Sequence, residues 1–208
     1  MVLILNLLKM LINTPPHLSH LNHISGVDEV GRGCLSGPVF AAAVVLPKDF
    51  TSDLIKDSKK LSEKKRNLAY QLIKDNAIEI SYSMVSAKEI DQINIQEATF
   101  LAMNKSIQNL KTKIDHILVD GNSFKSTQDI PYTCVVKGDN TYLSIAAASI
   151  VAKVTRDEYM KNLHEEYPKY EWNSNKGYGT KKHIDAIKEV GVTEEHRISF
   201  LKNILIND

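Results

Sequence analysis

The sequence feature that most constrains the fold is an uninterrupted apolar segment, VFAAAVVL at residues 39–46, which lies between Pro38 and Pro47. A short apolar run without polar alternation, bounded by prolines, predicts a buried β-strand. The preceding segment Ile24–Val30 also has strand character and ends at a glycine. Because a glycine-rich segment, residues 31–37, joins the two, we expect them to form a hairpin.

Strand-like and helix-like segments alternate over the rest of the chain. Ser62 is a predicted N-cap of a helix that carries Leu68 and Leu72 on one face. Apolar residues at helical spacing predict a long helix around residues 147–154. Further strands are expected at 78–85, 117–119 and 132–136, and further helices at 96–111, 182–189 and 194–203. This order predicts an α/β protein with a central mixed sheet flanked by helices and a helical C-terminal segment.

The length of 208 residues fits one domain. We place this domain at residues 23–208, after an apolar N-terminal extension at residues 1–22. The apolar run of the extension ends at Asn13, short of the about 20 residues that a membrane-spanning helix needs. No signal-peptide cleavage site of the Ala-x-Ala kind follows it. We therefore expect neither membrane association nor secretion.

Charge and cysteine content narrow the class of protein. The net charge is +1, so any surface for nucleic acid has to be a local patch. The two cysteines, Cys34 and Cys134, form no CxxC pair and no Cys/His cluster, which argues against a zinc site. Isolated cysteines are typical of reduced thiols, and we expect a cytoplasmic protein.

Acidic residues stand at the C-terminal ends of three predicted strands: Asp28 with Glu29, Asp120, and Asp139. Strand ends are where open α/β sheets build their sites. Carboxylates that converge there repel one another, and a divalent cation relieves the repulsion. Oxygen ligands suit Mg²⁺ or Mn²⁺, and two such ions can bind the attacking and leaving oxygens of a phosphoryl displacement.

Each acid also has a structural interpretation. Asp120 begins an Asp-Gly dipeptide, which is a common turn signal, and Asp139 could cap the helix that follows it. Asp28 and Glu29 are adjacent, so in a regular strand they point to opposite faces. Both serve one site only if the backbone is distorted there, and the glycines that follow allow a bulge.

The segment GVDEVGRG at residues 26–33 makes the acidic pair more specific. Gly31 and Gly33 let the backbone approach a ligand closely, and Arg32 between them can bind a phosphate through its forked guanidinium. A Gly-x-Gly pattern alone is weak evidence, whereas the same pattern shortly after an acidic pair is much more specific.

This segment is the first of seven motifs that resemble the ribonuclease HII family, in order from about Ile24 to the C-terminus. The motifs are GVDEVGRG (26–33), GPVFAAAVVLP (37–47), DSKKLSEKKR (57–66), VDGN (119–122), KGD (137–139), AAASIVAKVTRD (146–157) and GYGTKKH (177–183). Each alone is moderate evidence, but seven in register are very specific.

The resemblance implies a ribonuclease H-like fold and a metal-dependent endonuclease. The family cuts the RNA strand of RNA–DNA hybrids and nicks DNA duplexes 5′ of an embedded ribonucleotide, leaving 3′-hydroxyl and 5′-phosphate ends. The family uses two divalent ions, Mn²⁺ or Mg²⁺. Its catalytic acidic metal ligands fall on Asp28, Glu29, Asp120 and Asp139. Its substrate-binding elements fall on Gly31, Arg32, Gly33 and Tyr178.

Other basic residues have two interpretations each. The lysine-rich run around Lys59 is a solvated helix face or, beside a phosphate track, a surface that positions the substrate. Lys153 and Arg156 near Asp157 form either an ion-pair set, which we favour, or a phosphate clamp. In the C-terminal HRISF motif, Ile198 replaces an arginine that is common in the family, and we expect one phosphate contact to be weaker.

Two rival classes stay open at this point. Ribonuclease HIII is a relative with a substantial N-terminal substrate-binding domain, whereas about 23 residues precede the motifs here. A nucleic-acid-binding module without catalysis is the second, and the presence of all four acids argues against it. The expected partners are RNA–DNA hybrids and DNA duplexes containing ribonucleotides, and we expect a monomer.

Overall fold

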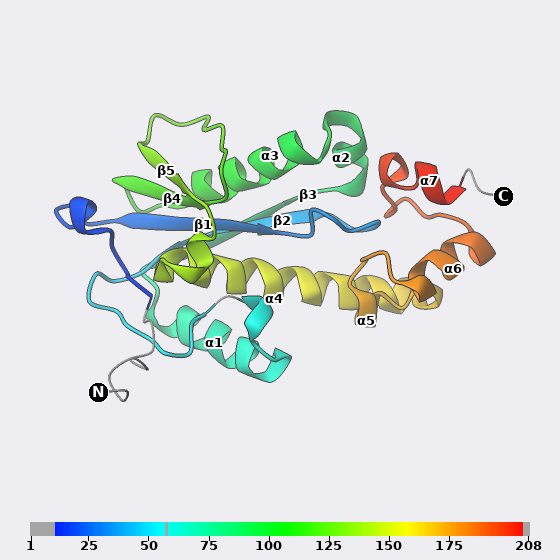
Figure 1. Cartoon of the computed structure of the whole chain (residues 1–208), viewed down its shortest axis with the longest axis horizontal. Helices are drawn as coiled ribbons and strands as arrows, with labels where there is room; N and C mark the ends of the chain where they lie inside the picture. The colour runs from blue at the N-terminus through cyan, green and yellow to red at the C-terminus, as the bar shows by residue number, and fades with distance from the viewer. Residues whose placement is uncertain (1–10, 57, 206–208) are drawn as a thin grey trace, which may run out of the picture.

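The computed structural model describes residues 11–56 and 58–205, and its centre is a five-stranded mixed sheet (Figure 1). The sheet has the order β3-β2-β1-β4-β5. β2 pairs antiparallel with β1 and β3, while β4 is parallel to both β1 and β5. The predicted mixed sheet and the predicted hairpin are therefore confirmed. The strands are β1 Ile24–Val30, β2 Val39–Val45, β3 Glu79–Val85, β4 His116–Asp120 and β5 Tyr132–Val135.

Helices cover both faces of the sheet. α3 lies on one face, and α4 lies on the other with α1 packed outside it (Figure 1). α5 and α6 lie near the C-terminal end of α4. The helices are α1 Glu63–Asn76, α2 Ala87–Ile93, α3 Ile95–Gln108, α4 Leu143–Glu166, α5 Trp172–Asn175, α6 Lys181–Val190 and α7 Lys202–Leu205. Short 3-10 helices form at Pro16–Leu18, Ser58–Lys60, Gly138–Asn140, Pro168–Tyr170 and Ile198–Phe200.

β2 is central to the core because all seven of its residues are buried. Ala41 and Ala43 belong to the cluster that packs against α3, whereas Ala42 and Val44 belong to the cluster that packs against α4. The side of α4 that meets the sheet carries the small residues 146–148. Small side chains on both elements let the helix lie close to the strands.

α4 lies very close to β1 at Gly26. A Cβ atom on Gly26 would lie 2.1 Å from the carbonyl carbon of Ser144 and 2.4 Å from the backbone nitrogen of Ile145. Both atoms belong to helical backbone and cannot rotate away. The glycine therefore sets the distance between α4 and β1, and with it the position of the end of β1.

The C-terminal segment differs from the sequence prediction. The helix predicted at residues 194–203 is wrong, because only a 3-10 helix and α7 form in this region. The backbone N–H of Arg197 donates to the carbonyl of Leu35 at 2.8 Å, and His196 forms a β-bridge with Ser36. This stretch bonds to a distant loop, and that long-range pairing overrides its local helical preference.

Two helices and one helix face were not predicted correctly. α2 was missed although Ser86 and Glu89 form a capping box at its start, and α5 is a single turn with no helical periodicity of its own. In α1, Ser62 is the N-cap as predicted. Leu68, however, is exposed, and the helix buries Ala69 and Ile73.

Residues 11–22 lie against the main domain. Ile12 forms a parallel bridge with Tyr142, and Asn13 Nδ2 donates to the carbonyl of Pro47 at 2.6 Å. The part of the extension that the structure describes therefore packs on the domain.

Some predicted features fall outside the described residues. Most of the apolar run of the extension lies in residues 1–10, and the first residue of the lysine-rich motif is Asp57. In the described parts of the chain, no helix has the length and apolar character needed to cross a membrane.

We predict that Gly26→Ala lowers the free energy of unfolding by about 3 kcal/mol, because the added methyl group meets the backbone of α4. Urea unfolding measures the change. Gly33→Ala is the control, since a Cβ there meets nothing within 4 Å. Equal losses of stability in the two variants would contradict the close approach of α4 to β1.

Candidate active site

Asp28 and Asp120 lie side by side at the ends of two parallel strands. Val27 of β1 pairs with Val119 of β4, so the next residue of each strand is an acid. Both valines belong to the cluster that packs against α3, and strand alternation turns the two acids to the α4 face. There Asp28 is only 5% exposed, and the nearby Ser149 side chain acts to lower its pKa.

Glu29 lies on the opposite face of β1 from Asp28. It pairs with Ala41, which belongs to the cluster against α3. The backbone distortion that would bring both side chains to one face is absent, because the β1–β2 register runs unbroken to the end of β1. The Glu29 carboxylate lies 3.5 Å from the guanidinium of Arg32, and it is still near enough to Asp28 for its charge to raise the pKa of Asp28.

Asp139 lies on the 3-10 helix that follows β5, beside Asp120. The backbone N–H of Gly138 donates to Asp120 Oδ1 at 2.6 Å, which ties this helix to the end of β4. Asp139 itself is buried. It does not cap α4, whose N-cap is Tyr142, so the capping interpretation of Asp139 is wrong.

The acids influence one another electrostatically. Burial raises the pKa of Asp28 well above its usual range, and the charges of Glu29 and Asp120 raise it further. Burial also raises the pKa of Asp120 in spite of the hydrogen bond from Gly138, and the charge of Asp139 adds to the rise. Ionising all of these groups together is therefore costly without a nearby cation.

The donor set fits a divalent cation in its chemistry, because every candidate ligand is a carboxylate oxygen. Among the residues that the structure describes, however, no three His, Cys, Asp or Glu side chains are gathered closely enough to hold a metal ion. The site is thus not a preformed cage. Mg²⁺ is commonly held by one or two carboxylates together with substrate phosphates, which is what Asp28 and Asp120 can offer.

The glycine-flanked arginine lies on a loop beside Tyr178. The backbone N–H of Leu35 donates to the carbonyl of Gly177 at 2.8 Å, which joins the two loops. Arg32 and Gly33 are exposed, and their backbone N–H groups donate to no acceptor within the described residues. Tyr178 is 40% exposed. The structure therefore brings the predicted substrate-binding elements together and leaves polar groups free for a ligand.

Two glycines make this contact between loops possible. Gly31 and Gly177 have φ angles of +92° and +82°, which side chains rarely adopt. A Cβ on Gly177 would also lie 2.5 Å from the carbonyl oxygen of Ser36. Burial raises the pKa of Tyr178, and the neighbouring Cys34 contributes to the rise, so the hydroxyl stays a hydrogen-bond donor at neutral pH.

Lys59 lies near the acids, on the 3-10 helix that precedes α1. Its charge acts to lower the pKa of Asp120. The next residue, Lys60, hydrogen-bonds to the side chain of Asn140, which follows Asp139. The start of the lysine-rich run therefore adjoins the acidic strand ends.

Arg156 differs from its sequence interpretation, and Arg197 has a role that the sequence did not indicate. The ion pair of Lys153 with Asp157 is confirmed at 2.6 Å. Arg156, however, is fully buried and belongs neither to that ion-pair set nor to a phosphate clamp. Arg197 of the HRISF motif is also fully buried, whereas Ile198 beside it is exposed. The side chains of both arginines donate to backbone carbonyls, a role that no local sequence pattern indicates.

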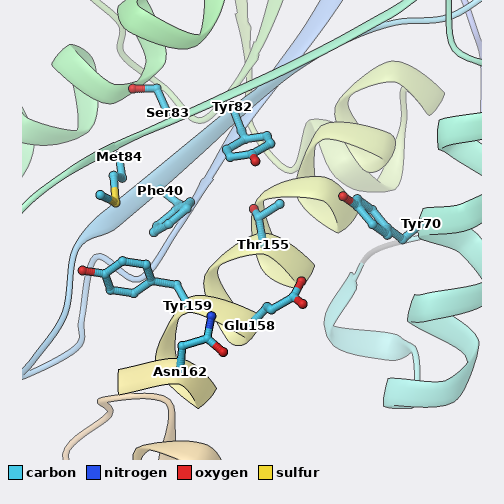
Figure 2. A pocket seen from close by; sticks show the side chains of 9 residues that line it. All are labelled: Phe40, Tyr70, Tyr82, Ser83, Met84, Thr155, Glu158, Tyr159 and Asn162. Atoms are coloured by element: carbon cyan, nitrogen blue, oxygen red, sulfur yellow. The ribbon is translucent and has the colours of Figure 1, made fainter. Parts of the chain in front are cut away.

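A groove of about 490 Å³ lies away from these residues, over the edge strand β3. Its nine lining side chains come from α1, β2, β3 and α4, and aromatic rings such as Tyr82 and Tyr159 dominate it (Figure 2). None of the predicted site residues lines it, so it does not compete with the strand ends as the candidate active site.

The same fold is found in solved structures of type 2 ribonucleases H. The structure superposes on ribonuclease H2 from Pyrococcus horikoshii with a TM-score of 0.75 and 24% identity, over 88% of this chain and 96% of the other. Bst-RNase HIII in complex with Mn²⁺ gives a TM-score of 0.72 at 18% identity, over 93% of this chain and 73% of the other.

Sequence comparison identifies the family within this class. The ribonuclease HII family model matches residues 25–203. The ribonuclease HII of Phocaeicola vulgatus is 54% identical over 184 residues, which cover 88% of this chain and 90% of the relative. The chain therefore belongs to the ribonuclease HII family of hydrolytic nucleases, which cleave the RNA of RNA–DNA hybrids. This result decides against ribonuclease HIII and against a binding module without catalysis.

A buried histidine pair supports the Tyr178 loop. His183 Nδ1 donates to the carbonyl of Tyr178 at 2.9 Å, and Trp172 Nε1 donates to His183 Nε2 at 3.1 Å. His196 Nε2 lies 3.3 Å from the same nitrogen, and the backbone N–H of Thr193 donates to His196 Nδ1. These partners require both imidazoles to be neutral, which agrees with their lowered pKa values.

We predict that acid destabilises the protein through this pair. Burial, followed by repulsion from His183, lowers the pKa of His196 from 6.5 to about 4. An unfolded chain takes up the proton below pH 6.5 and the folded chain does not, so the stabilisation is complete above pH 6.5 and is lost as the pH falls towards 4. The loss is about 3 kcal/mol, at about 1.4 kcal/mol for each unit of pKa shift.

Urea unfolding between pH 7 and pH 4 measures this slope. His196→Asn keeps an acceptor for Thr193 but does not titrate, so its free energy of unfolding should fall less steeply with acid than that of the wild type. His20→Asn, at an exposed position, is the control. A slope in His196→Asn as steep as in the wild type would show that the pair is not the acid-sensitive element.

Proposed function

We propose that the chain is an endonuclease that nicks DNA duplexes on the 5′ side of an embedded ribonucleotide, in addition to cutting longer RNA–DNA hybrids. The products carry 3′-hydroxyl and 5′-phosphate ends, and the reaction uses two Mn²⁺ or Mg²⁺ ions. The observation that carries the proposal is the placement of Asp28 and Asp120 on one face of adjacent parallel strand ends. The exposed amides of Arg32 and Gly33 follow a few residues further along.

The proposed metal ligands are Asp28 and Asp120, with Glu29 and Asp139 completing the set. When bound, the divalent ions activate the attacking water and stabilise the leaving oxygen. Nearby positively charged side chains help to keep these ligands ionised. The charges of Arg32 and Lys59 favour the ionised forms of Glu29 and Asp120, respectively, against the effect of burial.

The proposed reader of the ribonucleotide consists of the backbone groups of residues 31–33 and the ring of Tyr178. The 2′-hydroxyl distinguishes RNA from DNA at a given site, and free backbone N–H groups can bond to it. A site that hydrogen-bonds a substrate hydroxyl rejects an analogue without it, because its polar groups are then left unpaired. The Tyr178 ring can stack on the sugar while its hydroxyl stays protonated.

The lysine-rich run that begins near Lys59 supports binding without reading sequence. Contacts of lysines with phosphates fix the register of a duplex but carry no sequence information. The proposed partners are accordingly RNA–DNA hybrids and ribonucleotide-containing DNA, bound by a monomer.

We further propose that residues 23–208 are the catalytic domain and residues 1–22 an appended extension. The family match begins at residue 25, which supports this division. Both cysteines are free thiols, which agrees with action in a reducing compartment such as the cytoplasm.

We predict that Asp28→Asn and Asp120→Asn each lower the nicking rate by about 10³-fold or more, because a metal ligand contributes several kcal/mol to transition-state stabilisation. The substrate is a DNA duplex with one ribonucleotide, and the assay is run with Mg²⁺ or Mn²⁺ and with EDTA. Asp185→Asn, at an exposed position on α6, is the matched control.

The same variants test the electrostatic repulsion among the buried acids. Because burial and the charges of Glu29 and Asp120 disfavour the ionised form of Asp28, Asp28→Asn should raise the free energy of unfolding of the metal-free protein. Near-normal nicking by either acid variant overturns the assignment of metal ligands. No nicking by the wild type under any of these conditions overturns the proposed function itself.

We predict that Tyr178→Ala slows single-turnover nicking of the ribonucleotide duplex by about 10²-fold, the scale of a lost stacking contact of about 1–3 kcal/mol. Tyr178→Phe should keep most of the rate because the ring remains. Binding should persist in both through phosphate contacts. Tyr82→Ala is the control, since Tyr82 is similarly exposed but lies in the groove over β3 (Figure 2). A Tyr178→Ala rate equal to that of the wild type would make Tyr178 an ordinary loop aromatic.

A further inference from the structure

Two arginines lie behind the glycine-rich loop at residues 31–37, called the glycine loop below, and have no contact with solvent. Arg156 of α4 and Arg197 of the C-terminal segment are both 0% exposed. In the described part of the chain neither guanidinium takes part in an ion pair, and burial lowers the pKa of Arg197 to about 10. A buried charge without a counter-ion is costly unless its donors are satisfied. Their hydrogen bonds therefore indicate what the two residues are for.

Arg156 bonds to both loops of the candidate site. Its Nε donates to the carbonyl of Pro38 at 2.9 Å, and its Nη2 donates to that of Ser36 at 3.2 Å. Its Nη1 donates to the carbonyl of Lys176 at 2.8 Å, two residues before Tyr178. One planar group thus spans the loop that carries Arg32 and the loop that carries Tyr178.

Arg197 bonds to the glycine loop alone, at two points. Its Nε and Nη2 both donate to the carbonyl of Gly37, at 2.9 Å and 2.7 Å. Its Nη1 donates to the carbonyl of Arg32 at 2.9 Å. The carbonyl side of Arg32 is therefore held towards the interior, while the neighbouring N–H groups of Arg32 and Gly33 are free within the described residues.

Glycine at position 31 is tied to the same arrangement. A Cβ on Gly31 would lie 2.2 Å from Arg156 Nε and 2.8 Å from Arg156 Cζ. The missing side chain leaves the space through which the guanidinium passes beneath the loop. This packing gives Gly31 a role besides its positive φ angle.

From this geometry we propose that Arg156 and Arg197 are positioning residues for recognition of the ribonucleotide. They hold the glycine loop and the Tyr178 loop in one fixed relation, so that both reach the same sugar, although neither arginine touches the nucleic acid. The proposal rests on the proposed function, since it assigns the support of the same reader. Forked donors are required, because a single lysine ammonium cannot reproduce bonds to two separate carbonyls with planar geometry.

Asp91 of α2 offers a way to loosen this support from the surface. Its carboxylate accepts the backbone N–H groups of Ile198 and Ser199 at 2.8 Å and 3.0 Å, which fastens the 3-10 helix next to Arg197 to the main domain. Asp91 is only partly buried. Its replacement by alanine removes the anchor without burying an unpaired charge.

The test is single-turnover nicking of a one-ribonucleotide duplex at saturating enzyme, together with the dissociation constant for the same duplex. Arg197→Lys and Arg197→Met should slow the cleavage step on the order of 10²-fold, the cost of a misplacement of about 1 Å, with little change in duplex affinity. Asp91→Ala should show a smaller loss of the same kind. Met103→Ala, in the core against α3, is the control for a loss of stability alone and should cleave at the wild-type rate.

The outcomes separate the two proposals. If the wild type nicks the duplex and Arg197→Lys cleaves as fast as the wild type, the positioning role is wrong and the proposed function stands. If Arg197→Met does not fold, Arg197→Lys and Asp91→Ala decide, and wild-type rates in both overturn the role. Losses in duplex affinity alone, with an unchanged cleavage step, would also overturn it. If the wild type itself does not nick, the proposed function fails first.

Discussion

The structure depends on one electrostatic constraint, the burial of acids beside each other at the ends of β1 and β4. Parallel pairing puts Asp28 and Asp120 on the same face, and burial together with repulsion from neighbouring acids raises the pKa of both. A fold keeps such an arrangement at a cost to its own stability. The cost is understandable if a cation normally shares the site, since a divalent ion turns repulsion between ligands into binding energy.

The second requirement is that the acids keep a fixed position relative to the groups proposed to recognise the ribonucleotide, residues 31–33 and Tyr178. β1 supplies both, because the strand that carries Asp28 continues directly into the glycine loop. α4 fixes the strand at Gly26 and, three turns later along the same helix, supports the loop through Arg156. The same helix therefore positions the acids and the reader. A rigid element of this kind suits chemistry that depends on the placement of one phosphate relative to one sugar.

Much of the fold could be predicted because it depends on local patterns. The apolar run of β2, the N-cap Ser62 and the small residues of α4 all act on neighbouring turns or strands. The acids could be placed at or just after strand ends, but whether a bulge brings Glu29 to the face of Asp28 could not be predicted, since the β1–β2 register decides it. The helix predicted at residues 194–203 does not form, because hydrogen bonds from Arg197 to a loop 160 residues away replace helical hydrogen bonds. Arg156 follows the buried Ala152 and Ser149 at helical spacing, a signal that the adjacent acid Asp157 obscured.

The most direct measurement of the central claim is a titration of the protein with Mn²⁺ while its unfolding temperature is followed, without any nucleic acid. A ligand that binds only the folded state raises its stability with concentration. If the buried acids form the metal site, the unfolding temperature of the wild type rises with Mn²⁺, and most of this rise is lost in Asp120→Asn. An equal rise in both proteins, or no rise in the wild type, would contradict the claim that these acids share a cation.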